Sequence, residues 1–157
     1  MAKTATKWAM IGTGGMALKI IRDFKRTESV ELTTIVSRSL ERGLTFATEW
    51  EVPKVLVDLE RLWDERDIDV VYIATPNSEH HGLARAALQA HKHVVVEKPI
   101  TTTAEEAREL VALARAAEWA RFRFSHVPRP TTMLDADVEI GTRQLVVQGR
   151  AGGRPCS

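Results

Sequence analysis

The sequence contains almost no cysteine. Its single cysteine, Cys156, stands next to the last of 157 residues. One cysteine excludes a disulfide within the chain and a zinc site built from several thiolates. His80 and His81 are adjacent, so on a helix their side chains point about 100° apart and do not simply share an ion. The sequence therefore predicts no metal site.

An excess of charge of one sign is also absent. Lys and Arg number 22 against 21 for Asp and Glu, so the net charge is +1. Nucleic acid and anionic membranes normally bind a concentrated basic face, so neither is an expected partner. No apolar run approaches the length of a membrane span, and the stretch "MAKTATKWAMIG" is too short and too polar for a signal peptide. We expect a cytoplasmic protein.

What the sequence does have is a regular alternation of short apolar runs with helical patterns. Strands are predicted at 7–12, 29–37, 54–58, 69–76, 92–97 and 121–127, and helices at 16–26, 40–50, 59–66, 78–90 and 103–117. Such alternation implies right-handed crossovers and a parallel sheet with helices on both faces. The predicted fold class is a doubly wound α/β Rossmann fold. We assign it to residues 1–127, because residues 128–157 show no clear period beyond one short apolar run at 145–150.

Local signals refine three of these helices. Thr103 with Glu106 three residues later forms a capping box, so the last helix has the clearest start. For the helix at 78–90 the predicted cap is Asn77 or Ser78. Gly43 is expected to weaken the helix at 40–50, because glycine has a low helix propensity.

The stretch "GTGGMA" (12–17) lies between the first strand and the first helix, as in the dinucleotide-binding fingerprint with alanine in the third glycine position. Gly12 allows the tight turn, and Gly14 has no Cβ to block a pyrophosphate. The helix N-terminus offers N–H groups to the phosphates. A cofactor is therefore predicted to contact Gly12, Thr13, Gly14, Gly15 and Met16. The alternative is a glycine-rich turn without a ligand.

The residues at the end of the second strand are expected to determine whether NAD or NADP binds. An Asp or Glu there binds the ribose of NAD, whereas an arginine accommodates the 2′-phosphate of NADP. Here the strand ends "VSRS", so Ser37 and Arg38 occupy the position. We therefore favour NADP(H) over NAD(H). The alternatives are that Arg38 is a solvated loop residue, or that it stacks on adenine without discriminating between the two cofactors.

Polar residues also follow the fourth and fifth strands, at the same edge of the sheet as the glycines. The fourth strand ends "IATPN" and the fifth ends "EKP". Ligands of open α/β sheets bind at this edge. The predicted contacts from this region are Ala74, Thr75, Pro76, Asn77, Glu97 and Lys98, together with His80 in the first turn of the following helix.

Over residues 6–127 the sequence resembles the glucose–fructose oxidoreductase/inositol dehydrogenase (Gfo/Idh/MocA) family. The resemblance rests on "GTGGMA", on "SR" and above all on the long stretch from "DVVYIATPNSEHH" to "EKPITTTAEEA". It implies hydride transfer between a nicotinamide and a sugar, a polyol or a related hydroxyl or carbonyl group. It also implies that Glu97 and Lys98 lie beside the nicotinamide and substrate, with Lys98 polarising the reacting carbon–oxygen group. The alternative is an ordinary ion pair at a strand end.

The resemblance further implies a second α/β domain that forms the substrate pocket and the oligomer interface and supplies a histidine for proton transfer. Residues 128–157 resemble only the start of that domain, and His126 cannot be assigned the histidine's role. The chain is thus expected to be a fragment that is inactive alone and that forms homo-oligomers only with the missing domain. The alternative function is a stand-alone dinucleotide-binding module without catalysis.

Overall fold

The structure is a computed structural model that describes residues 5–116 and 122–124. Its strands form one parallel sheet in the order β3-β2-β1-β4-β5-β6. They are β1 (Thr6–Ile11), β2 (Val30–Val36), β3 (Lys54–Leu56), β4 (Val70–Ile73), β5 (His93–Val96) and β6 (Phe122–Phe124). The predicted doubly wound fold is confirmed. Residues 125–157, which include His126, Cys156 and the whole segment 128–157, lie outside the described residues, so the domain boundary stays a prediction.

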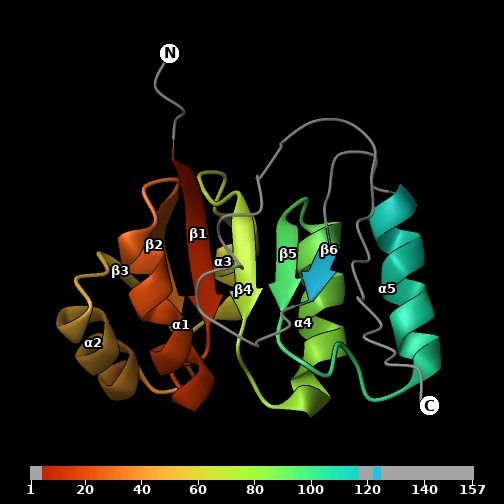
Figure 1. The fold of residues 1–157 in the computed structure, drawn as a ribbon, viewed down its shortest axis with the longest axis horizontal. Coiled ribbons are helices and arrows are strands. Elements are labelled where there is room, and N and C mark those ends of the chain that lie inside the picture. The colour runs from red at the N-terminus through yellow and green to blue at the C-terminus, as the bar shows by residue number, and fades with distance from the viewer. Residues whose placement is uncertain (1–4, 117–121, 125–157) are drawn as a thin grey trace, which may run out of the picture.

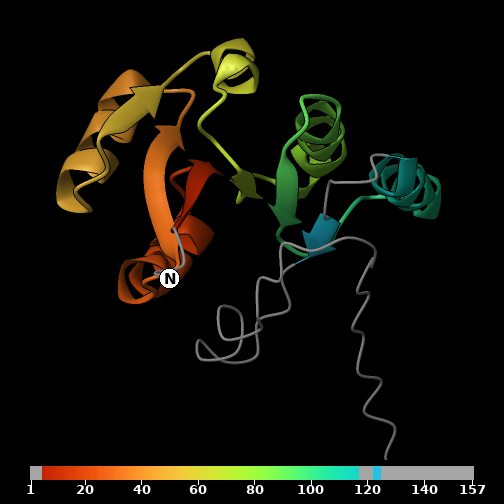
Figure 2. The same cartoon turned by 90° about the horizontal axis from the view of Figure 1, so that it is seen from above.

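Five helices connect these strands and cover both faces of the sheet (Figure 1). They are α1 (Gly15–Arg26), α2 (Leu40–Glu49), α3 (Leu59–Asp64), α4 (Asn77–Gln89) and α5 (Ala104–Ala116). The buried apolar side chains of α1 and α2 belong to one cluster, and those of α3, α4 and α5 to a second. Figure 2 shows the two helical layers on opposite sides of the sheet. None of the helices in the described part of the chain is long and apolar enough to cross a membrane.

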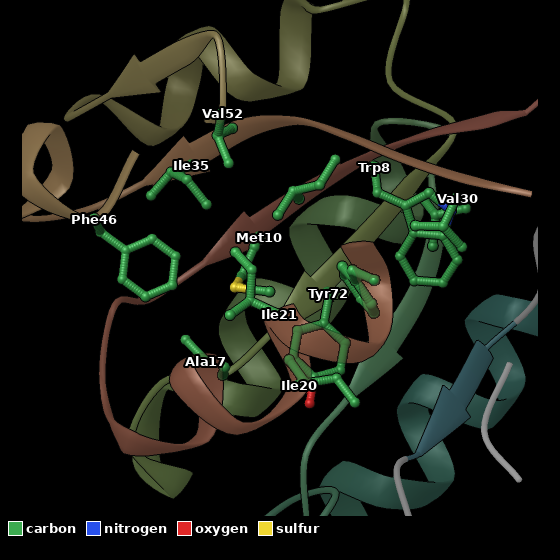
Figure 3. Packing of buried hydrophobic residues seen from close by; sticks show 14 of the residues in the cluster. Trp8, Met10, Ala17, Ile20, Ile21, Val30, Ile35, Phe46, Val52 and Tyr72 are labelled. Atoms are coloured by element: carbon green, nitrogen blue, oxygen red, sulfur yellow. The ribbon is translucent and has the colours of Figure 1, made fainter. Parts of the chain in front are cut away.

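The central strands are buried on both sides, which explains their nearly unbroken apolar sequences. In β1, Trp8 and Met10 face the α1 layer, whereas Ala9 and Ile11 face the α4 layer. On the α1 side, the Phe24 ring packs edge-on against Trp8 at 5.1 Å and against Tyr72 at 5.5 Å between ring centroids. Figure 3 shows Tyr72 in this cluster beside Ile20 and Ile21.

The start of α5 agrees with its sequence signal. The Thr103 hydroxyl accepts the N–H of Glu106 at 3.2 Å, and the Glu106 carboxylate accepts the N–H of Thr103 at 3.1 Å. These two bonds are the predicted capping box.

The predicted cap of α4 was wrong. The helix begins at Asn77, and its N-cap is Pro76, which makes no side-chain capping bond. The physical reason is that the Pro76 carbonyl accepts the N–H of Glu79 at 2.9 Å, so the backbone closes the first turn itself. The fixed φ of proline suits a residue at the beginning of a helix.

Gly43 has a packing role that its low helix propensity conceals. A Cβ at this position would lie 2.7 Å from Cγ1 of Val55 and 3.1 Å from Cβ of Ser37. Glycine therefore lets α2 lie close against β3 and the end of β2. This close packing offsets the propensity cost that the sequence pattern indicates.

Candidate dinucleotide-binding site

The loop after β1 is held against the end of β4 by Gly12. Gly12 has a φ of +106°, and a Cβ there would lie 2.6 Å from the Ala74 carbonyl oxygen. Both the conformation and the space therefore require glycine. The N–H of Gly12 donates to the Val36 carbonyl at 2.9 Å, so the same residue also fixes the loop against β2.

Gly14 differs from Gly12 because the space around it is open. A Cβ at Gly14 would meet no described heavy atom within 4 Å, and Gly14 is the N-cap of α1. The first turn of α1 contains no acidic residue. The partial positive charge at the helix N-terminus is thus not offset locally, and an anionic group can approach its N–H groups closely.

A pocket of about 650 Å³ extends from this loop past the ends of β2 and β4, a volume within the range of small-molecule sites. Of the predicted contacts, eight line it: Gly12, Thr13, Gly14, Ser37, Arg38, Ala74, Thr75 and Pro76. Six do not: Gly15, Met16, Asn77, His80, Glu97 and Lys98. The pocket therefore unites the glycine loop with the proposed cofactor-selecting residues, and leaves the residues after β5 outside it.

One polar atom in the pocket wall lacks a partner. The Thr75 hydroxyl oxygen is buried, and the described residues offer it no hydrogen bond. An unsatisfied buried hydroxyl is costly, so a bound polar ligand would relieve this cost. This orphaned atom and the open space at Gly14 both fit a nucleotide cofactor.

One end of the pocket carries positive charge from two elements. Arg38 follows β2, and Arg42 lies in the first turn of α2. Ser39 caps α2 by accepting the N–H of Arg42 at 3.3 Å, and the Ser37 hydroxyl accepts the N–H of Ser39 at 3.3 Å. The Arg38 side chain is 85% exposed, and its guanidinium donates to the Glu79 carboxylate of α4 at 3.2 Å.

Apolar side chains form much of the remaining wall. Val57, Leu59 and Leu83 line the pocket from the loop after β3, from α3 and from α4. A wall of this kind suits a planar aromatic ring. Sequence reasoning missed these residues, and it missed Arg42 and Glu79. Arg42 had a readable signal, because "SRSLER" puts an arginine one helical turn after a capping serine.

The residues after β5 point in different directions. Glu97 is buried, and its carboxylate accepts a hydrogen bond from the Tyr72 hydroxyl. Lys98, the next residue, is exposed. The N–H of Glu97 donates to the Ile73 carbonyl at 3.1 Å, so the two residues stand where the sheet ends between β4 and β5. Glu97 is thereby fixed in the interior, while Lys98 faces the surface at this edge.

His80 connects the segments that follow β4 and β5. Its side chain is fully buried, with Nδ1 2.7 Å from the Pro99 carbonyl oxygen and Nε2 2.9 Å from the Thr75 carbonyl oxygen. Its neighbour His81 lies instead 2.9 Å from the Glu109 carboxylate on α5. The histidines diverge as predicted, and in the described ranges no group of three or more His, Cys, Asp or Glu residues could hold a metal ion.

Comparison with known proteins identifies the family. The profile of the GFO_IDH_MocA family, described as an oxidoreductase family with an NAD-binding Rossmann fold, matches residues 6–122. The chain belongs to this family. The resemblance seen in the sequence is thus confirmed, and the described domain is the nicotinamide-dinucleotide-binding Rossmann domain of a Gfo/Idh/MocA oxidoreductase.

Curated Gfo/Idh/MocA relatives include enzymes named for sugar and polyol substrates. The 1,5-anhydro-D-fructose reductase of Ensifer adhaerens is 38% identical over 93% of this chain and 42% of its own length. The scyllo-inositol 2-dehydrogenase (NADP⁺) of Bacillus subtilis is 32% identical over 70% of this chain and 34% of its own length. The chain therefore spans less than half the length of either relative.

One solved structure of similar fold was crystallised with a nicotinamide cofactor. A 3-ketoreductase from Actinomadura kijaniata, crystallised with TDP-benzene and NADP, aligns with a TM-score of 0.73 and 28% identity. The alignment covers 77% of this chain and 38% of the ketoreductase. The fold of this Gfo/Idh/MocA chain is thus similar to part of an enzyme that was crystallised with NADP.

Proposed function

We propose that this chain is the nucleotide-binding part of an NADP-dependent oxidoreductase that transfers hydride between the nicotinamide and a hydroxyl or carbonyl group of a sugar or polyol. The proposal rests above all on one observation. The same pocket is lined by the open glycine loop at Gly14 and, at its basic end, by Arg38 and Arg42. The family match and the substrates in the relatives' names support the reaction class.

In this proposal the pyrophosphate lies against Gly14 and the N-terminus of α1. The adenine ring lies on the apolar wall formed by Val57, Leu59 and Leu83. The adenosine 2′-phosphate then lies at the basic end, where arginine guanidinium groups bind phosphate through charge-assisted, often bidentate, hydrogen bonds. This is the cofactor preference that the "VSRS" segment predicts, strengthened by Arg42.

The proposed catalytic group is the Lys98 ammonium, supported by the carboxylate of Glu97. The bound nicotinamide donates or accepts the hydride. Lys98 donates a hydrogen bond to the reacting oxygen of the substrate and stabilises the negative charge that develops there. The Tyr72 hydroxyl holds the Glu97 carboxylate in a buried position one residue before Lys98 in the chain. Asn77, Gly15 and Met16 remain predicted cofactor contacts at the same sheet edge.

His80 enters this proposal through its bonds to the backbone. Because its two ring nitrogens lie within hydrogen-bond distance of the Thr75 and Pro99 carbonyl oxygens, its ring packs between the segment after Lys98 and the pocket wall. We therefore propose that His80 positions this segment, in addition to the cofactor contact predicted for it from the sequence. Its burial makes direct polarisation of a substrate the weaker interpretation.

Calorimetric titration of the purified chain with NADPH and with NADH tests the proposal. NADPH is expected to bind about tenfold to a hundredfold more tightly, since hydrogen bonds to charged groups contribute about 1.5–3 kcal/mol. Arg38→Ala and Arg42→Ala should each narrow this difference and weaken its dependence on salt. Equal affinities in the unmodified chain would contradict the NADP preference, and no affinity for either would contradict the proposed site.

A further inference from the structure

The ion pair between Arg38 and Glu79 crosses the basic end of the pocket. The two residues are 41 positions apart, and Arg38 follows β2 whereas Glu79 lies in the first turn of α4. Both line the pocket, and the guanidinium Nη1 lies 3.2 Å from the carboxylate Oε1. The Glu79 carboxylate therefore accepts a hydrogen bond from the same arginine that the proposed function assigns to the 2′-phosphate.

We propose that Glu79 competes with the 2′-phosphate of the cofactor for Arg38, and so limits the preference of this site for NADPH over NADH. The inference rests on the proposed function, because it takes the Arg38 end of the pocket as the 2′-phosphate site. A carboxylate and a phosphate offer the guanidinium the same kind of acceptor oxygens. Arg38 thus exchanges one anionic partner for the other when NADPH binds.

The exposure of the pair makes this exchange feasible. The Arg38 side chain is 85% exposed and the Glu79 side chain 34% exposed. An exposed ion pair of this kind raises the equilibrium constant for folding by at most about fivefold, so breaking it costs little free energy. A phosphate with close to two negative charges, placed between Arg38 and Arg42, makes stronger contacts.

Glu79 also acts on the phosphate directly. Its carboxylate belongs to the same pocket wall, and like charges at short range repel. NADH carries a hydroxyl in place of the 2′-phosphate. This hydroxyl can donate a hydrogen bond to the Glu79 carboxylate. Glu79 therefore disfavours NADPH by both repulsion and competition, and does not disfavour NADH.

The test is calorimetric titration of Glu79→Gln with NADPH and NADH. Glutamine keeps the size of the side chain and removes its charge, so NADPH affinity should rise about threefold to tenfold while NADH affinity stays equal or falls. Glu79→Ser provides a second variant with the same expected direction. The matched control is Glu109→Gln on α5, since Glu109 pairs with Arg85 at 3.1 Å and does not line the pocket. This control removes the same charge elsewhere and should leave both affinities unchanged.

A second arm examines whether the effect passes through Arg38. In an Arg38→Ala background, Glu79→Gln should raise NADPH affinity by a smaller factor, because only the direct repulsion remains. A fall in NADPH affinity in both Glu79 variants would overturn the inference and make Glu79 a residue that holds Arg38 in place. Unchanged affinity in both would overturn it as well, while the unmodified chain's preference for NADPH would leave the proposed function intact. No binding of NADPH to the unmodified chain would overturn both.

Discussion

At the scale of single residues, two glycines of one loop have different roles, Gly12 in stability and Gly14 in the proposed cofactor binding. Gly12 is fixed by its φ of +106° and by the Ala74 carbonyl, whereas Gly14 borders open space. We predict that Gly14→Val abolishes dinucleotide binding while leaving the fold intact. Gly12→Ala should instead destabilise the fold, by about 1–3 kcal/mol for a strained backbone position. Urea unfolding and cofactor titration of the two variants provide the measurement.

The reciprocal result would contradict this assignment. If Gly14→Val bound cofactor normally, the open space at the N-terminus of α1 would not be where the pyrophosphate lies. If Gly12→Ala kept full stability, the close approach to Ala74 would be relieved by a small backbone shift.

Lys98 is the residue on which the proposed chemistry depends. We predict that Lys98→Met, in a polypeptide that contains the complete active site, lowers kcat by about a hundredfold or more, within the range for loss of one electrostatic donor. NADPH affinity should change little, because a contact that strengthens as charge develops acts on turnover. Steady-state kinetics and a cofactor titration test this. Near-normal kcat would reduce Lys98 to an ordinary charge at a strand end.

At the scale of elements, the start of α5 makes the stability of the fold sensitive to acid. The Glu106 carboxylate accepts hydrogen bonds from the Thr102 hydroxyl at 2.8 Å and from the N–H groups of Thr102 and Thr103, each at 3.1 Å. These bonds, that of the Thr102 hydroxyl above all, hold the pKa of Glu106 below its ordinary value of 4.5. A carboxylate with a lowered folded-state pKa stabilises the fold above its unfolded-state pKa and loses this effect as the pH falls.

Glu106→Gln should therefore lower the free energy of unfolding at pH 7, and the difference from the unmodified chain should shrink below about pH 4. Urea unfolding at both pH values is the measurement. Glu105→Gln is the matched control, because Glu105 lies in the same first turn of α5 and outside the capping box. An equal effect of the two variants would show that only the helix dipole is involved.

Element order and type could be predicted from the sequence because each apolar run and each helical period is a local pattern. The capping box at Thr103 is similarly local, and it was confirmed. The start of α4 was not predictable in this way, because the Pro76 backbone carbonyl took the place of a side-chain cap. Gly43 could be read only as a weak helix residue, since the value of its missing Cβ depends on Val55 of another element.

At the scale of the whole molecule, the candidate site also combines residues that carry a local sequence signal with residues that do not. The glycine loop and the "VSRS" segment carry local signals, and the structure brings both to one pocket. Val57, Leu59 and Leu83 carry none, because each is an ordinary apolar residue until the chain crossings bring it to the wall. Glu79 is similar, since its partner Arg38 precedes it by more than a complete strand–helix unit. Sites assembled from distant elements need tertiary structure to be seen.

The strand order has a consequence for how the chain is made on the ribosome. β1 is synthesised first among the described strands yet lies in the interior of the sheet, where Trp8 pairs with Leu32 on one side and with Val70 on the other. Translation at about 5–20 residues per second delays the second neighbour by several seconds. During this interval β1 and β2 expose an apolar edge that β4 will later cover. Nascent chains halted before Val70 should therefore be the form of this protein that chaperones bind and that aggregates most readily.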